Sequence, residues 1–385
     1  MIFDANSLAA GPVSFFGHYD FDVRPLGISP RRLPAWTRNQ IPEMMNTVVR
    51  MPSGVRIVFE TDADDIQLRV QTTRMFYPPQ EPRPVVFDLK VDGKLVDSYC
   101  SGNGNTILIN RTNPEDYTME KGDAYIVSFP GLGKHIKRCE IWLPHNAFVE
   151  IQQLDLRNAN VVNPVSLPQE NRWLHYGSSI SHCMEADQPT GSWPAVAADL
   201  NNIHLQNLGF GGQCHLDQFV ARTIRDTKTD LITIKTGINI INMDSMRERV
   251  FTPTLHGFID TIREGHADTP IVLISPIYCP SAETQPGPTI PDSNGQFKTL
   301  TGHEEIQGGC LTLTRVRDII EDLVKKRHEA GDQNLFYLNG LSLFNKDDAK
   351  DLPDDLHPNP AGYRRMGQRF AKEILRYRGA PTTQL

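Results

Sequence analysis

The sequence predicts an all-β domain over residues 1–165, followed by an α/β domain over residues 166–385. Three observations support this division. The chain has 385 residues, which is more than the roughly 100–200 residues of a typical single domain. Apolar residues alternate with period two in the first part. After about residue 165 short apolar strands alternate with helical stretches, which is typical of a parallel sheet covered by helices on both faces.

The first domain is expected to be a β-sandwich or jelly-roll-like module. Val55, Ile57 and Phe59 alternate with other residues, and turn residues such as Ser53-Gly54 separate such runs, as in half-buried antiparallel strands. Asp92-Gly93 lies between two strand-like runs and predicts a type I′ hairpin, because glycine accepts a positive φ. No convincing helix interrupts this pattern between residues 45 and 155. Further strands are expected at Tyr125–Phe129, Cys139–Leu143 and Phe148–Leu154.

The second domain shows helices with recognisable ends. A helix is expected over Leu311–Ala330, with Gly331 as its stop, and a last helix with Asn359 as N-cap and Pro360 at its first position. The segment from Cys279 to Gly309 is rich in Pro and Gly and is expected to be an irregular lid, binding loop or mobile loop. Strands are expected at Trp173–Tyr176, Ile203–Asn207, Leu231–Lys235, Ile271–Ile274 and Leu335–Leu338.

Composition and charge restrict the function. With 39% hydrophobic and 22% charged residues the chain resembles an ordinary soluble globular protein. A net charge of −7 disfavours nucleic acid or an anionic membrane as the main partner. No segment approaches the roughly 18 apolar residues of a membrane span, and no signal peptide is visible. The expected compartment is the cytoplasm, with secretion after loss of a leader as the alternative.

The six cysteines are scattered without CxxC spacing, so we expect thiols in a reducing compartment. Neither clustered ligands nor an HExxH pattern predicts a metal, and no cofactor is expected.

Two short motifs suit the two halves of a serine esterase. Ser179 lies in Tyr176-Gly177-Ser178-Ser179-Ile180, and His357 lies in Asp354-Asp355-Leu356-His357-Pro358. A serine hydroxyl is a poor nucleophile unless a base takes its proton, and that histidine needs a partner to orient its ring. Ser179, His357 and Asp354 supply these three parts. Each motif alone also fits an ordinary turn or a loop that enters a helix.

The placement of the motifs favours a common site. Gly177-Ser178-Ser179, Gly209-Phe210-Gly211-Gly212 and Gly237-Ile238-Asn239 each follow a predicted strand directly. Open parallel sheets bind ligands beyond the carboxyl ends of their strands, so three motifs at such ends are expected to converge. The glycine run contains neither a P-loop nor a complete GxGxxG pattern, and the GxSxG elbow of α/β-hydrolases is absent because Ser181 follows Ile180.

Taken together, the motifs resemble the four blocks of the SGNH (GDSL-type) hydrolase family, in the same order. The resemblance extends from Trp173 to the end of the last helix and implies a flavodoxin-like doubly wound parallel sheet. It implies Ser179 as nucleophile, His357 as base and Asp354 as its partner. It also implies an oxyanion hole made by the backbone N–H groups of Ser179 and Gly212 and by the side chain of Asn239.

The sequence departs from the family pattern twice. Ser178 replaces the usual aspartate before the nucleophile, and Ile240 replaces the common aspartate after Asn239. Both missing carboxylates have supporting roles in the family. Asp354 is therefore the only motif-supported partner of His357, and a Ser-His dyad stays open as an alternative.

A β-rich module before a Gly-Ser-Ser-Ile block looks like the two-domain carbohydrate esterases of this family. This resemblance implies hydrolysis of short-chain, acetyl-like O-acyl esters of a carbohydrate, a glycoside or a related metabolite through an acyl-serine. An acyltransferase that uses the same acyl-enzyme and a non-catalytic carbohydrate-binding protein remain alternatives. Glycoside hydrolysis by paired carboxylates is disfavoured, because it leaves Ser179 and Asn239 without a role.

Three neighbours of the motifs are candidate substrate-binding residues: His182, Trp193 and Cys214. The competing interpretation is structural. Trp193-Pro194 opens a helix and packs, and His182 lies at the surface or behind the nucleophile.

Overall fold

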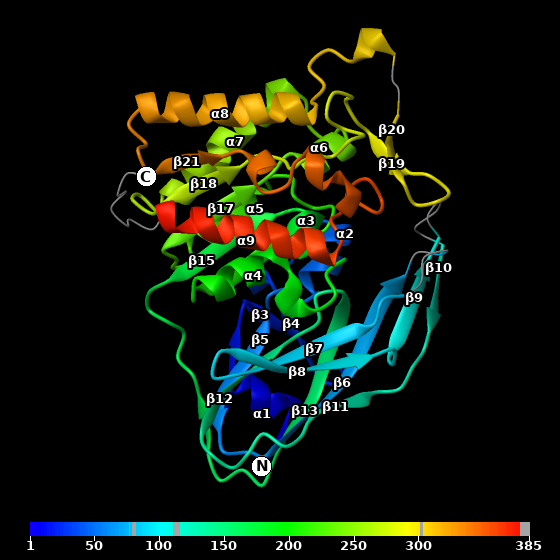
Figure 1. Ribbon diagram of the computed structural model, residues 1–385, viewed down its shortest axis with the longest axis vertical. Helices are drawn as coiled ribbons and strands as arrows, with labels where there is room; N and C mark the ends of the chain where they lie inside the picture. The colour runs from blue at the N-terminus through cyan, green and yellow to red at the C-terminus, as the bar shows by residue number, and fades with distance from the viewer. Residues whose placement is uncertain (77, 79–81, 111–115, 301–302, 378–385) are drawn as a thin grey trace. The chain divides into compact units, whose positions relative to one another are not determined.

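A computed structural model describes residues 1–76, 78, 82–110, 116–300 and 303–377 (Figure 1). The chain divides into two units. The first comprises Met1–Leu167 together with Asp187–Thr190, and the second comprises Pro168–Ala186 and Gly191–Leu385. The short segment Asp187–Thr190 therefore groups with the first unit, although the sequence pattern placed it in the second domain.

The first unit is built from two mainly antiparallel sheets, which confirms the all-β prediction. Among the described residues, β6 and β9 are its only parallel neighbours. One sheet contains, in spatial order, β10 (Tyr117–Glu120), β9 (Asn105–Ile109), β6 (Asp65–Phe76), β13 (Ala147–Arg157), β4 (Ile28–Arg31) and β3 (Asp20–Val23), with β1 (Ile2–Asp4) beside β13 and β11 (Tyr125–Phe129) beside β6. The other contains β14 (Val162–Pro164), β5 (Arg56–Thr61), β12 (Lys137–Trp142), β7 (Val85–Val91) and β8 (Lys94–Ser101), with β2 (Ser14–Phe16) beside β5.

The core of this unit uses the alternating residues, and Ile57, Phe59 and Leu68 are completely buried in one hydrophobic cluster. The predicted hairpin joins β7 to β8, with φ values of 48° at Asp92 and 81° at Gly93, as a type I′ turn requires. The sequence pattern did not predict the short helices of this unit. They are α1 (Ala5–Ala9), α2 (Glu43–Val49) and the 3₁₀ turn η1 (Ala35–Thr37).

The second unit contains a five-stranded parallel sheet within its described residues. Numbered along the chain, the strands lie in the order 2-1-3-4-5, so the strand order reverses between the first and third strands. Ligands of open α/β sheets bind beyond the carboxyl ends of the strands at such a switch point. In spatial order the strands are β16 (His204–Gly209), β15 (Arg172–Gly177), β17 (Leu231–Lys235), β18 (Ile271–Ile274) and β21 (Leu335–Leu338).

Helices cover this sheet, with α7 and α8 on one side and α4 and α9 on the other (Figure 1). Asn359 caps α9 as predicted, because its Oδ1 accepts a hydrogen bond of 2.9 Å from the Gly362 N–H. Among the described residues, no helix is both long and apolar enough to cross a membrane. The helices are α3 (Ser179–His182), α4 (Trp193–Leu200), α5 (Gln218–Arg225), α6 (Ile238–Asn242), α7 (Glu248–Arg263), α8 (Leu313–Glu329) and α9 (Pro360–Tyr377), with 3₁₀ turns η2 (Pro189–Gly191, shared by the two units), η3 (Glu304–Ile306), η4 (Gly340–Ser342) and η5 (Lys346–Asp351).

The segment from Cys279 to Gly309 is irregular over most of its described length, as predicted, but it also contains short regular elements that the sequence did not indicate. Strands β19 (Thr289–Pro291) and β20 (Phe297–Thr299) form an antiparallel hairpin, and η3 follows it. At the base of the segment, Glu283 accepts two hydrogen bonds of 2.8 Å from the Arg317 guanidinium of α8. Residues 301–302 lie outside the described residues.

The end of β16 lies against the backbone of α3. A Cβ atom added to Gly209 would lie 2.5 Å from the backbone nitrogen of His182 and still closer to the carbonyl carbon of Ser181. Only a residue without a side chain allows this approach, since backbone atoms cannot move aside as a flexible side chain would. The glycine therefore determines how closely α3 packs on the sheet.

We predict that Gly209→Ala destabilises the protein by about 1–3 kcal/mol or more, because the new methyl group overlaps backbone atoms. Urea unfolding followed by circular dichroism measures the change. Gly257→Ala is the matched control, because Gly257 lies inside α7 with no atom within 4 Å of an added Cβ. That substitution is expected to stabilise the helix by up to about 1 kcal/mol. Equal effects of the two substitutions would contradict the packing argument.

Candidate active site

Ser179 is the first residue of α3 and follows the end of β15 after one intervening residue. Ser178 caps the helix, and its side chain accepts a hydrogen bond from the Ile180 N–H. Cys183 ends the helix in the left-handed conformation, with φ 61°. Ser178 and Ile180 are buried, whereas Ser179 keeps partial exposure. The local structure thus leaves one hydroxyl of this turn accessible at the carboxyl edge of the sheet.

A buried polar chain connects α3 to the sheet. The two ring nitrogens of His175 lie 2.7 Å from Ser181 Oγ and 2.6 Å from Thr233 Oγ1, and Trp173 Nε1 donates to the same threonine. Burial, reinforced by the charge of Lys235, lowers the pKa of His175 well below 6.5, so its ring is neutral at pH 7. On the other side, Asn207 Nδ2 donates to Ser181 O over 3.0 Å. These bonds fix the helix that carries Ser179.

The structure brings together the three residues that the sequence motifs singled out. His357 Nε2 lies 2.9 Å from Ser179 Oγ, and His357 Nδ1 lies 2.7 Å from Asp354 Oδ2. Asp354 Oδ1 also accepts hydrogen bonds from the backbone N–H groups of Leu356 and His357, which hold the loop in a tight turn. The serine hydroxyl, the imidazole and the carboxylate therefore form a continuous hydrogen-bonded chain.

Two opposing effects act on the pKa of Asp354. Burial raises it, whereas hydrogen bonds from the His357 ring and from the backbone N–H groups of His357 and Leu356 lower it, and the net result lies below 3.8. The carboxylate is consequently ionised at neutral pH. An ionised Asp354 accepts the Nδ1–H of His357 and leaves Nε2 free to accept the Ser179 hydroxyl proton.

The segment 279–309 packs against the loop that carries His357. The ring of Phe297 meets the His357 ring edge-on, with 5.6 Å between centroids, and Phe297 N–H donates to Asp354 O over 3.0 Å. Gln296 Nε2 donates to Pro353 O, and Cys279 Sγ donates to Asp355 O. Sequence reasoning missed Phe297, because no local pattern distinguishes an aromatic residue in a Pro- and Gly-rich segment.

Gly212 and Asn239 follow the strands on either side of β15. In the sheet Gly177 lies level with Gly209 of β16 and with Lys235 of β17, so all three motifs begin at one edge, as predicted. Asn239 Oδ1 accepts a hydrogen bond of 3.0 Å from Cys214 N–H, which orients the amide. No hydrogen bond among the described residues uses Asn239 Nδ2 or the backbone N–H groups of Ser179 and Gly212. These three donors are available to a ligand.

The three candidate substrate-binding side chains are completely buried. Trp193 Nε1 donates to Ile180 O, and its ring packs against Phe370. His182 Nδ1 accepts a hydrogen bond from Gly211 N–H, so a surface position for His182 is wrong. Cys214 Sγ donates to Lys235 O, and its backbone N–H donates to Asn239 Oδ1 in α6. Burial gives all three a packing role, and we propose no direct substrate contact for them.

The described residues contain no group of three or more His, Cys, Asp or Glu side chains arranged to hold a metal ion.

Comparison with known proteins agrees with this geometry. Residues 175–365 match the model of the GDSL-like Lipase/Acylhydrolase family. The C-terminal unit is a GDSL-like domain. Residues 13–151 of the first unit match the N-terminal domain of SsfX3. The chain thus combines the GDSL-like domain with an SsfX3-type all-β domain.

Solved structures share this two-domain fold over nearly the whole chain. The salicylyl-acyltransferase SsfX3 from a tetracycline biosynthetic pathway is 24% identical, covers 99% of this chain and 98% of its own, and has a TM-score of 0.80. A Bacteroides ovatus protein assigned as a GDSL-like lipase is 16% identical, with coverages of 98% and 97% and a TM-score of 0.68. A family two carbohydrate esterase from Clostridium thermocellum is 13% identical, with coverages of 94% and 98% and a TM-score of 0.57. No curated protein matches the chain significantly.

A buried lysine lies close to the centre of the GDSL-like domain. Lys235 ends β17, is 2% exposed and forms no ion pair with an acidic residue within the described part of the chain. Burial lowers the pKa of its ammonium group from 10.5 to about 8, although the thiols of Cys214 and Cys183 act in the opposite direction. Folding at neutral pH therefore carries the cost of burying this charge.

We predict that Lys235→Met stabilises the protein at pH 7 and that the gain shrinks as the pH rises from about 8 to 10.5. The folded-state pKa lies below the unfolded-state value, so the penalty is complete below pH 8 and absent once both states are neutral. A pKa shift of this size corresponds to a pH-dependent change in the free energy of unfolding on the order of 3 kcal/mol. Urea unfolding at several pH values measures it.

Lys372→Met, on an exposed position of α9, is the control and is expected to leave the pH dependence unchanged. Parallel stability curves for wild type and Lys235→Met would refute the assignment.

Proposed function

We propose that this protein transfers acyl groups from esters through an acyl-serine at Ser179. The observation that carries the proposal is the hydrogen-bonded chain from Ser179 Oγ through His357 to Asp354. Ser179 Oγ attacks the acyl carbon while His357 Nε2 takes its proton, and the imidazolium then gives that proton to the leaving alcohol. Asp354 holds the ring in the correct tautomer and stabilises its charged form.

The donors near Ser179 supply the second requirement, an anion site for the tetrahedral intermediate. We assign this role to the backbone N–H groups of Ser179 and Gly212 and to Asn239 Nδ2. Their hydrogen-bonding capacity is unused by the described residues, and the bond from Cys214 N–H to Asn239 Oδ1 fixes the amide in advance. Fixed donors stabilise developing charge without the cost of reorganisation.

For the reaction we propose hydrolysis of a short-chain O-acyl ester of a carbohydrate, a glycoside or a related metabolite. The support is the combination of a GDSL-like domain with a preceding all-β domain, which also occurs in the family two carbohydrate esterases. Water is the acceptor in this reaction, and His357 activates it as it activates Ser179 in the first step.

A second candidate is transfer of the acyl group to an alcohol. The similarity to the salicylyl-acyltransferase SsfX3 favours it, because this similarity extends over both domains and includes the match to the SsfX3 N-terminal domain. Both reactions pass through the same acyl-enzyme and differ only in the acceptor that reaches it.

Ser179→Ala is expected to abolish covalent labelling by a fluorophosphonate, because the reagent reacts only with an activated serine. Mass spectrometry of the intact protein measures the label. Ser245→Ala is the matched control, since Ser245 is an exposed serine whose Oγ lies 2.8 Å from Nδ1 of His215, and it is expected to keep full labelling. Labelling that persists in Ser179→Ala would assign the nucleophile to another residue.

Asn239→Ala is expected to lower kcat by about 10²–10³ with little change in KM, because its amide binds charge that develops only in the transition state. Hydrolysis of p-nitrophenyl acetate measures both constants. Unchanged kcat would exclude Asn239 from the anion site.

Asp354→Asn is expected to lower kcat by about 10⁴, because an amide in place of the carboxylate favours the wrong tautomer of His357. A loss of less than about tenfold would show that a Ser179–His357 dyad is sufficient.

The ratio of free acid to acylated alcohol among the products shows which acceptor takes the acyl group from the acyl-enzyme. We expect p-nitrophenyl esters from acetyl to octanoyl, tested beside acetylated sugars, to show a preference for the short acyl groups and release of free acid. Transfer of most of the acyl group to an added alcohol, measured by mass spectrometry of the products, would instead support the acyltransferase.

A further inference from the structure

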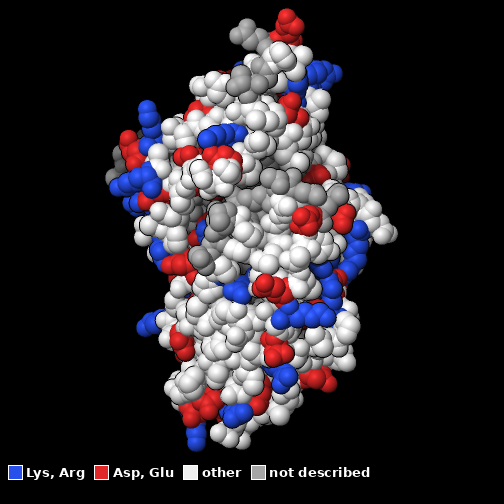
Figure 2. Space-filling view, turned by 90° about the vertical axis from the view of Figure 1, so that its right-hand side faces the viewer, with Lys and Arg blue, Asp and Glu red and all other residues white. Residues whose placement is uncertain are grey.

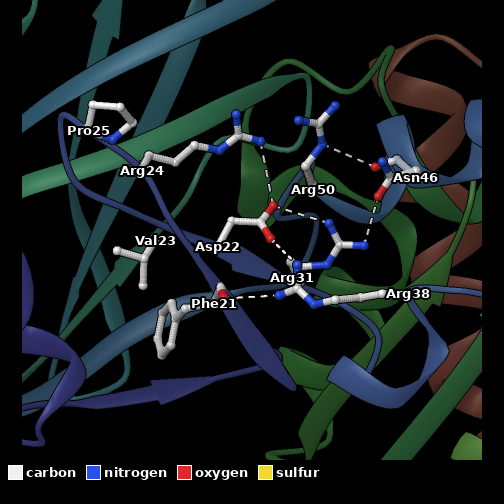
Figure 3. Close-up of a pocket in the computed structure, with 9 residues that line it drawn as sticks. All are labelled: Phe21, Asp22, Val23, Arg24, Pro25, Arg31, Arg38, Asn46 and Arg50. Carbon is white, nitrogen blue, oxygen red and sulfur yellow. Dashed lines mark hydrogen bonds and ion pairs between the residues drawn. The ribbon is translucent and has the colours of Figure 1, made fainter.

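The first unit contains an open cavity of about 570 Å³ lined by four arginines. On the face shown in Figure 2, basic and acidic side chains are interspersed, whereas the cavity lining contains four arginines and one aspartate. The cavity lies between the β3–β4 hairpin and the C-terminal end of α2 (Figure 3). Its described lining residues are Phe21, Asp22, Val23, Arg24, Pro25, Arg31, Arg38, Asn46 and Arg50.

Two of the arginines are held by protein acceptors. Arg31 donates to Asp22 Oδ2 over 3.1 Å and to Asn46 Oδ1 over 2.8 Å, and its side chain is almost completely buried. Arg38 donates to Asp22 Oδ1 over 2.5 Å and also binds Asp20. Together they occupy both oxygens of Asp22. The terminal nitrogens of Arg31 and the guanidinium of Arg38 are therefore already engaged by protein acceptors.

The guanidinium of Arg50 has fewer protein acceptors than those of Arg31 and Arg38. Its Nε donates to Asn46 O over 3.2 Å, but its terminal nitrogens have no acceptor and it forms no ion pair among the described residues. The guanidinium lies over the Phe148 ring, 5.0 Å from the centroid, which holds the group in place. Burial and the charge of Arg24 lower the pKa of Arg50, so the cation lies in a site that is costly without an anion.

Arg24 is the second donor with spare capacity. Its guanidinium reaches Asp22 only at 3.6 Å and Glu150 only at 4.0 Å, which are beyond hydrogen-bonding distance. Figure 3 shows that both Arg24 and Arg50 have terminal nitrogens without a drawn interaction. Two guanidinium forks with free N–H groups are the arrangement that proteins use for carboxylates and phosphates.

We propose that this cavity binds a small molecule with a carboxylate or phosphate group through Arg50 and Arg24. The acidic groups near it are Asp20 and Asp22, which are engaged by Arg38 and Arg31, and Glu150, which lies near Arg24. The cavity exceeds the size of a single oxyanion, and Phe21 and Pro25 offer apolar surface to the remainder of the ligand. All of its described lining residues belong to the first unit.

Isothermal titration of the full-length protein in about 50 mM NaCl tests the proposal. The ligands are glucuronate and glucose 6-phosphate, with glucose as the uncharged match and inorganic phosphate as the free anion. We expect saturable binding of at least one charged sugar and none of glucose, weakened at high salt. The preferred ligand identifies the anionic group, and phosphate binding equal to that of glucose 6-phosphate would show that the sugar is not recognised.

The variants Arg50→Gln and Arg24→Gln are each expected to raise Kd at least tenfold. Arg157→Gln, an exposed arginine of β13 outside the cavity, is the matched control and should bind as wild type. Thermal unfolding without ligand establishes that each variant is folded, and the 34% exposed Arg24 provides the test if Arg50→Gln does not fold. Absence of binding by wild type, or equal binding by the cavity variants and wild type, would overturn the proposal. Since the readout is binding, this outcome is separate from that of ester chemistry at Ser179.

Discussion

The candidate active site depends on the close contact between α3 and the ends of two neighbouring strands. At Gly177 and Gly209 an added Cβ would overlap atoms of Ser181, so both strands must end in glycine for the helix to approach them. Bonds from His175 and Asn207 to Ser181 then fix the helix without any exposed group. A rigid helix start is what allows a serine hydroxyl to meet a histidine from a distant loop with the precision that acyl transfer requires.

The other half of the site is supported in a different way. His357 lies on a loop, and loops lack the regular backbone bonds that hold strands and helices in place. Asp354 compensates for this by binding two backbone N–H groups as well as the imidazole. The β19–β20 hairpin adds Phe297 against the ring, and Arg317 with Glu283 anchors the base of this segment. A region that is rich in Pro and Gly thus holds His357, the proposed general base, in place.

The structure agrees best with the sequence-based predictions where residues close together in the chain determine the conformation. Strands β11, β17, β18 and β21 have the bounds that their apolar patterns indicated, and the Asp92-Gly93 turn has the dihedral angles that its residues favour. Elements that depend on packing were missed. The three-residue strands β19 and β20 are too short to show alternation, and α1 and α2 are too short to show a helical period. The burial of His182 and Cys214 likewise depends on what folds over them.

By itself the sequence determined the types of the main elements, the α/β character of the second unit and the positions of the Ser179, Gly212, Asn239 and Asp354–His357 motifs, because each of these follows from neighbours along the chain. Tertiary structure alone decided that His357 Nε2 lies 2.9 Å from a serine 178 residues away, and that Cys214 orients Asn239. It also decided that Arg24 and Arg50 share one cavity. These contacts result from the order of strands in a sheet and from the packing of loops on it. The periodicity of a sequence predicts neither of them.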